Sequence, residues 1–78
     1  MAVEWRDPPA SPWVARIEPC MERPGCWAMV HRFREPSFAH QAARDLRTLR
    51  LAPGRPAGVW EFRSAGGEVF ARYLGETA

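Results

Sequence analysis

Two runs of alternating side chains joined by a glycine pair constrain the fold of this chain most. Residues 58–64 and 68–74 are rich in aromatic and β-branched residues, and they flank Gly66-Gly67. Glycine tolerates positive φ, which suits a primed two-residue turn, so the pattern predicts a β-hairpin. In that register residue 64 pairs with 69, 62 with 71 and 60 with 73. One face of the hairpin then carries Trp60, Phe62, Val69, Ala71 and Tyr73.

The other face of the predicted hairpin mixes charge with aromatic surface. The register places Glu61 opposite Arg72, which predicts an ion pair across the strands. It places Arg63 opposite Phe70, which predicts a cation–π pair. The residue types at these two paired positions are therefore those that this register requires.

Residues 12–23 predict an amphipathic helix. Pro12, preceded by Ser11, suits the first helical position. Trp13, Ile17 and Met21 then recur at helical spacing on one side.

Pro19 lies inside this predicted helix. A proline in a helix interior costs about 3 kcal/mol, because it removes a hydrogen bond and crowds the preceding turn. We therefore expect the helix to kink near residues 15–18 or to divide into two short turns. A strand over residues 13–17 is the alternative.

Residues 26–34 predict a strand, ended by Glu35-Pro36, and residues 37–50 predict a second helix. The alanines on the apolar side of this helix predict close approach to a sheet. Its apolar positions are Phe38, Ala39, Ala42, Ala43, Leu46 and Leu49.

These elements predict one α+β domain over residues 11–75: an N-terminal helix, then a three-stranded antiparallel sheet in β-α-β-β order with a helix packed on one face. An extended arm rich in Pro and Trp is expected over residues 1–10, and a tail over residues 76–78. The predicted core consists of Ile17, Met21, Val30, Phe38, Ala42, Leu46, Leu49, Trp60, Phe62 and Tyr73.

Composition limits the classes of function. A chain of 78 residues with 46% hydrophobic residues predicts one folded domain. No apolar run approaches the ~18 residues of a membrane span, and the N-terminus lacks the layout of a signal peptide, so we expect a soluble intracellular protein. All eleven basic residues are Arg, and a net charge of +2 permits nucleic-acid binding without requiring it.

The cysteine and histidine positions match no familiar metal-site spacing. Cys20 and Cys26 lie six apart, and adding His31 and His40 does not produce a zinc motif. A disulfide is the other alternative, but reduced thiols are expected in an intracellular protein. We expect no cofactor and no metal.

The sequence carries no catalytic signature. Neither histidine has a sequence neighbour that reads as a general-base partner. The chain also has no G-x-S-x-G elbow and no glycine loop for phosphate. We therefore expect a non-enzymatic protein with no small-molecule substrate.

Two kinds of binding surface are predicted. Trp5, Trp13 and Trp27 are the candidates for contact with a host protein or for self-association, although Trp5 could instead pack back onto the domain. The alternative is nucleic-acid (DNA) binding through a basic stripe on the second helix together with the hairpin. That alternative uses His40, Arg44, Arg47, Arg50, Arg63, Phe70 and Arg72.

Three motifs resemble a known group of proteins: Pro24-Gly25-x-Trp27-Ala28, then Trp60-Glu61-Phe62-Arg63, then Ala71-Arg72-Tyr73. With the alanine-rich helix between them, residues 13–75 resemble small uncharacterised proteins of actinobacteriophages and related actinobacteria. The resemblance favours a helix over residues 12–23, from which Pro19 departs. It implies a non-catalytic phage-type protein that binds and modulates a host macromolecule in the bacterial cytoplasm.

Overall fold

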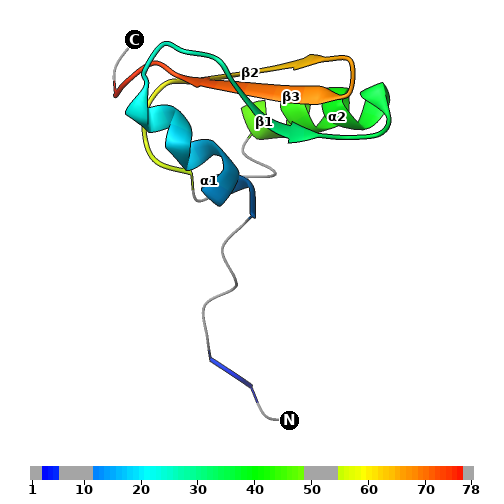
Figure 1. Ribbon diagram of the computed structural model, residues 1–78. Helices are drawn as coiled ribbons and strands as arrows, with labels where there is room; N and C mark the ends of the chain where they lie inside the picture. Colours follow the sequence, from blue (N-terminus) through cyan, green and yellow to red (C-terminus); the bar gives the residue numbers. More distant parts are fainter. Residues whose placement is uncertain (1–2, 6–11, 49–54, 77–78) are drawn as a thin grey trace.

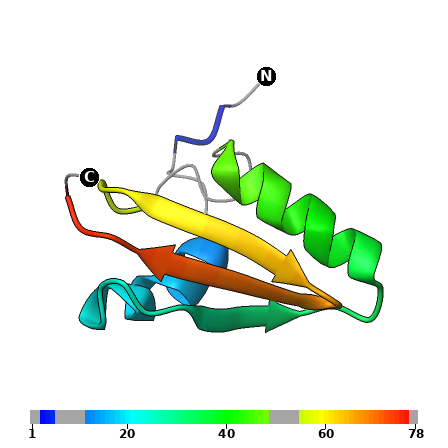
Figure 2. The same cartoon turned by 90° about the horizontal axis from the view of Figure 1, so that it is seen from above.

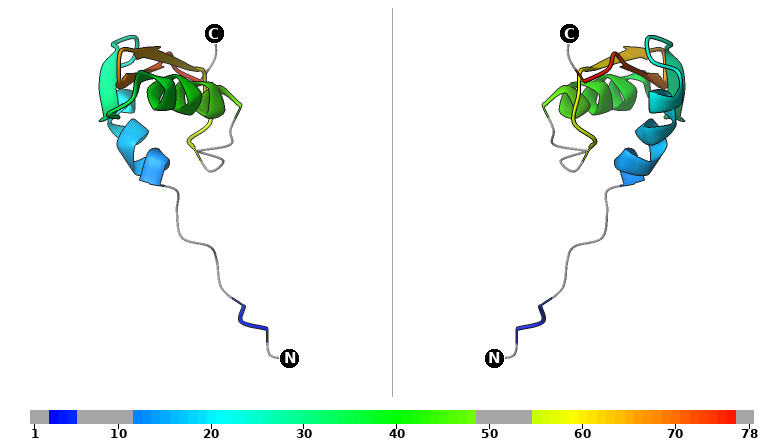
Figure 3. Two further views of the ribbon diagram at one scale, coloured as in Figure 1. Left: turned by 90° about the vertical axis from the view of Figure 1, so that its right-hand side faces the viewer. Right: turned by 90° about the vertical axis from the view of Figure 1, so that its left-hand side faces the viewer.

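The chain forms a mixed α+β structure, as the sequence predicts. A computed structural model describes residues 3–5, 12–48 and 55–76. Its strands form one antiparallel sheet in the order β1-β3-β2. Both helices lie on the same face of that sheet (Figure 1; Figure 3). The elements are α1 (Pro12–Ile17), the 3₁₀ helix η1 (Glu18–Glu22), β1 (Ala28–Arg32), α2 (Pro36–Arg47), β2 (Trp60–Ala65) and β3 (Glu68–Tyr73).

The hairpin of β2 and β3 has the predicted register, and β3 is the central strand (Figure 2). Gly66 has a φ of 59°, whereas Gly67 lies outside the left-handed region. Positive φ at only the first turn position is typical of a type II′ turn. Ser64 pairs with Val69, Phe62 with Ala71, and Trp60 with Tyr73.

A β-bulge in β1 changes which side chains face the helices. The register between β1 and β3 shifts between Met29 and His31. Met29 lies opposite Phe70, but His31 lies opposite the fully buried Val69. Because side chains alternate along a strand, the extra residue at Val30 turns His31 toward the helices. A regular strand over residues 26–34 would have placed Met29 and His31 on the same side.

Pro19 divides the N-terminal helix, as expected. The α-helix ends at Ile17, and the chain continues as a 3₁₀ helix with the proline in its first turn. A 3₁₀ helix has about three residues per turn, so the next inward position after Ile17 is Cys20. Cys20 is accordingly 4% exposed, while the predicted Met21 is half-buried.

Helix α2 packs closely on the sheet through its alanines. Ala39, Ala43 and Leu46 are fully buried, which places the β2 and β3 backbones near the helix. The prediction that Phe38 belongs to the core is wrong, because its side chain is 58% exposed. At about 100° per residue, Phe38 lies roughly a quarter turn from the buried stripe.

The other predicted core positions are confirmed where the structure describes them. Leu49 lies outside the described residues. Three of the confirmed positions, Met21, Val30 and Trp60, are half-buried against the core. Core residues that were not predicted include Trp13 and Cys20. The buried core consists of Trp13, Ile17, Cys20, Ala39, Ala42, Ala43, Leu46, Phe62, Val69, Ala71 and Tyr73.

Both cysteines are free thiols. Cys20 is buried, and its Sγ lies 3.8 Å from the carbonyl oxygen of Ala71, to which it donates. Burial raises the pKa of the Cys20 thiol, which keeps it protonated. Cys26 is exposed.

The two turn glycines make a matched pair for testing the hairpin. A Cβ added to Gly67 would lie 2.4 Å from the Phe33 carbonyl oxygen, so the backbone would have to shift. A Cβ on Gly66 would meet nothing within 4 Å. We expect Gly67→Ala to lower the free energy of unfolding by about 2–3 kcal/mol. Gly66→Ala should cost about 1 kcal/mol, from positive φ alone. Urea denaturation measures both, and an equal or reversed order would contradict the observed turn.

Candidate binding surface on the open sheet face

One face of the sheet has no described helix over it. Both α1 and α2 pack against the other face, through residues such as Ile17 and Leu46 (Figure 1). The register directs alternate side chains of the three strands away from the helices. We call this surface the open sheet face. It consists of Trp27, Met29, Arg32, Glu61, Arg63, Glu68, Phe70 and Arg72.

Trp27 directly precedes the edge strand β1, and its ring contacts arginines from both of the other strands. The Arg72 guanidinium carbon lies 4.6 Å from the centroid of its ring, and that of Arg63 lies 4.9 Å away. Arg63 was predicted to stack on Phe70, and that prediction is wrong. Arg63 reaches over β3 to Trp27 instead, and indole is the strongest cation–π ring. The sequence could not place Trp27 there without the strand order.

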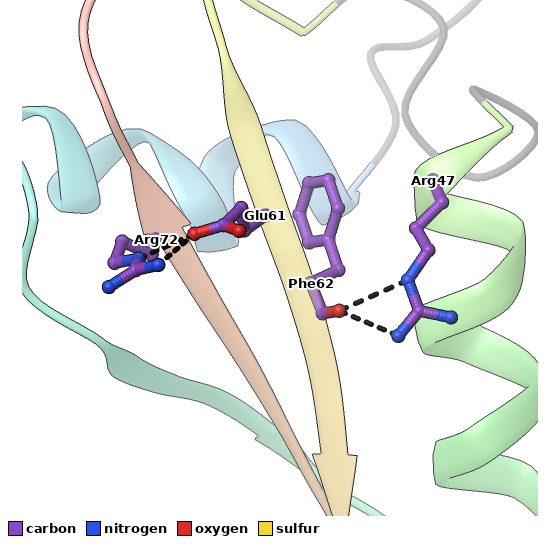
Figure 4. A network of polar contacts seen from close by, with 4 residues as sticks. All are labelled: Arg47, Glu61, Phe62 and Arg72. Carbon is purple, nitrogen blue, oxygen red and sulfur yellow. Dashed lines mark hydrogen bonds and ion pairs between the residues drawn. The ribbon is translucent and has the colours of Figure 1, made fainter. Parts of the chain in front are cut away.

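Two ion pairs hold much of the charge on this face. Arg72 donates through Nε to Glu61 Oε1 at 2.8 Å, and its Nη2 donates to the same oxygen (Figure 4). This contact confirms the predicted Glu61–Arg72 pair. Arg32 donates to Glu68 at 2.8 Å. Among the described residues, no carboxylate pairs with Arg63, so the face keeps one unpaired cation.

A hollow of about 240 Å³ adjoins this face along β2. Arg47 enters it from α2 and donates through Nε and Nη2 to the Phe62 carbonyl oxygen, at 3.1 and 2.8 Å (Figure 4). Arg47 therefore links the helix to the outer edge of β2. The hollow is lined by Trp27, Arg47, Trp60, Glu61, Phe62 and Arg63.

The predicted tryptophans do not form one surface. Trp13 is 7% exposed and belongs to the core. It therefore offers no exposed surface to a partner. Trp5 is 90% exposed, so it does not pack back onto the domain. Trp27 is half-buried beneath its two arginines. Met29, which is 45% exposed beside it, was not predicted as a contact residue.

The residues of the nucleic-acid alternative divide between two faces. His40 and Arg44 are exposed on α2, whereas Arg63, Phe70 and Arg72 lie on the open sheet face. Arg50 lies outside the described residues. Arg47 alone connects the two groups, and two of its donors are already used by Phe62.

The described residues limit two further classes of site. Within residues 3–5, 12–48 and 55–76, no three His, Cys, Asp or Glu side chains gather where they could hold a metal ion. Among the same residues, no helix has the length and apolarity needed to cross a membrane.

His31 lies in a separate aromatic cluster behind β1. Its ring centroid lies 5.3 Å from that of Trp13 and 4.6 Å from that of Phe33, both in edge-on geometry. Desolvation in this cluster lowers the pKa of His31 below 6.5, and the charge of Arg16 adds to the effect. The cluster thus favours neutral imidazole.

We expect stability to fall as the pH drops through about 6.5, because the unfolded chain then binds a proton that folded His31 resists. Above that pH the contribution is fully present. Urea midpoints measured between about pH 5 and 7 should show this slope in the wild type and lose it in His31→Phe. His40→Gln, on the exposed side of α2, should keep the slope. An unchanged slope in His31→Phe would refute the assignment.

Comparisons of the chain with protein-family models, curated sequences and solved structures found no match. The resemblance to small actinobacteriophage proteins stays a prediction.

Proposed function

We propose that this chain is a non-catalytic binding protein that contacts a protein partner through its open sheet face. The observation that carries the proposal is the arrangement around Trp27, where two guanidinium groups lie over one indole on a sheet face without a described helix. Trp and Arg are enriched at the residues that dominate binding energy in protein interfaces. Met29 and Phe70, paired across β1 and β3, add apolar surface beside them.

The charges favour a protein partner over nucleic acid. The face carries three Arg and two Glu, and each Glu already pairs with an Arg. Nucleic-acid binding depends on many cations that neutralise phosphates. An ion-paired face with apolar side chains between the pairs suits a polypeptide surface better, because aromatic residues, Met and Arg are enriched at protein interfaces.

The proposed setting follows from the resemblance described above. A small phage-type protein of this kind would act in the bacterial cytoplasm and modulate a host macromolecule by contact. The partner in this proposal is a host protein, and self-association through the same face is the competing arrangement.

Two exposed apolar residues on opposite sides of the sheet provide a matched test. Met29 lies on the open sheet face, whereas Phe38 lies on α2. We expect Met29→Asp to weaken capture of bacterial proteins from a lysate roughly thirtyfold, as for a hot-spot residue. Phe38→Asp should retain capture.

Sedimentation of the purified chain complements this test. If the wild type is a monomer and Met29→Asp no longer captures bacterial proteins, the result supports a host protein as the partner. If the wild type forms concentration-dependent dimers and Met29→Asp abolishes them, the partner is a second copy of this chain and not a host protein. Equal capture by wild type, Met29→Asp and Phe38→Asp would reject the open sheet face.

A further inference from the structure

We propose that the hollow beside β2 seats a carboxylate side chain of an acidic partner polypeptide. This inference rests on the proposed function, since it names the chemistry by which a protein partner would be recognised. The hollow is continuous with the open sheet face, because Trp27, Glu61 and Arg63 belong to both.

The charged groups that line the hollow favour binding of an anion. Its lining carries two guanidinium groups, of Arg47 and Arg63, and one carboxylate, of Glu61. That carboxylate is already bound by Arg72. In the described part of the chain, neither Arg47 nor Arg63 has a carboxylate partner of its own. Two cations therefore border one hollow whose single carboxylate, that of Glu61, is already bound by Arg72.

Both guanidinium groups are held in place and still have donors to offer. A guanidinium has five N–H donors. Arg47 uses two of its groups, Nε and Nη2, on the Phe62 carbonyl oxygen, which fixes the plane of its fork. Arg63 lies over the Trp27 ring, 4.9 Å from its centroid, and donates no hydrogen bond to another described residue. Such prior ordering lowers the entropy lost when an anion binds.

The walls of the hollow favour a carboxylate on a short aliphatic stem. The half-buried Trp27 lines it, so the methylene groups of an Asp or Glu would meet the aromatic surface of its ring. Glu61 also lies in the lining, and it would repel a phosphate with nearly two charges more strongly than a carboxylate with one. The two arginines then suit the fork geometry of a carboxylate.

The edge of β2 beside the hollow is also poorly suited to pairing with an added strand of a partner. The outward carbonyl of Phe62, which an added strand would need, is occupied by Arg47. A partner strand could pair there only by displacing two charge-assisted hydrogen bonds. A carboxylate arriving from the open sheet face would instead use the remaining donors without breaking them.

The test measures binding of a fluorescently labelled oligoglutamate by anisotropy at low salt. We expect saturable binding to the wild type, weakened roughly ten- to a hundredfold by Arg63→Gln, which removes hydrogen bonds to a charged group. Arg47→Gln should weaken binding by a similar factor, and its thermal midpoint shows whether it remains folded. Arg44→Gln removes one exposed positive charge on α2 outside the hollow, so it is the matched control and should change binding by less than about threefold.

Several outcomes would overturn the inference. Absence of oligoglutamate binding would do so, as would equal loss in Arg63→Gln and Arg44→Gln, which indicates only general charge attraction. Tighter binding of an oligothymidylate of equal charge would assign the hollow to nucleic acid. If oligoglutamate fails to bind while Met29→Asp still abolishes capture, the inference of carboxylate binding in the hollow is wrong. Binding of a protein partner through the open sheet face is then retained. If both fail, the proposed function fails as well.

Discussion

The register set at the Gly66–Gly67 turn decides what each face of this protein contains. β3 is the central strand, so its alternate residues supply both the core and the open sheet face. Val69 and Ala71 are fully buried, while Phe70 and Arg72 point the other way. Because side chains alternate with a period of two, a slip of one residue would exchange these sets. It would place the Arg72 charge in the core.

The bulge in β1 determines which side chains of that strand face each side of the sheet, and the hairpin register alone does not determine this. It lets Met29 join Phe70 on the open sheet face while His31 joins Trp13 on the helix side. It also returns Arg32 to the outer side, where it meets Glu68. One extra residue thus gives a five-residue strand both an apolar contact outside and an aromatic contact inside. The edge position of β1 accommodates it, because bulges are concentrated at sheet edges.

Local features of the fold could be predicted, and features set by tertiary packing could not. The hairpin register follows from alternation and turn chemistry within about sixteen residues, and Pro19 announces the break in the first helix. The bulge at Val30 has no such local signal, so the inward turn of His31 was missed. Phe38 was placed in the core because its apolar character was visible, whereas the rotation of α2 was not.

The open sheet face shows the same division between local and tertiary features. Glu61 and Arg72 could be paired because they share the hairpin. Trp27 could be named from composition alone, but not its two arginines, since that requires knowing that β3 lies between β1 and β2. Likewise, Arg47 was recognised as a basic helix residue. Its hydrogen bonds to Phe62 depend on how closely the alanines let α2 approach β2.

Both edges of the sheet carry features that hinder backbone pairing with another chain. At β2, Arg47 occupies the outward carbonyl of Phe62. At β1, the strand is short and bulged. Short strands, bulges and charged side chains are the means by which proteins discourage pairing at sheet edges. With backbone pairing hindered at both edges, the proposed recognition would fall to side chains. The open sheet face presents Trp27 and Met29 together with Arg63, which has no carboxylate partner among the described residues.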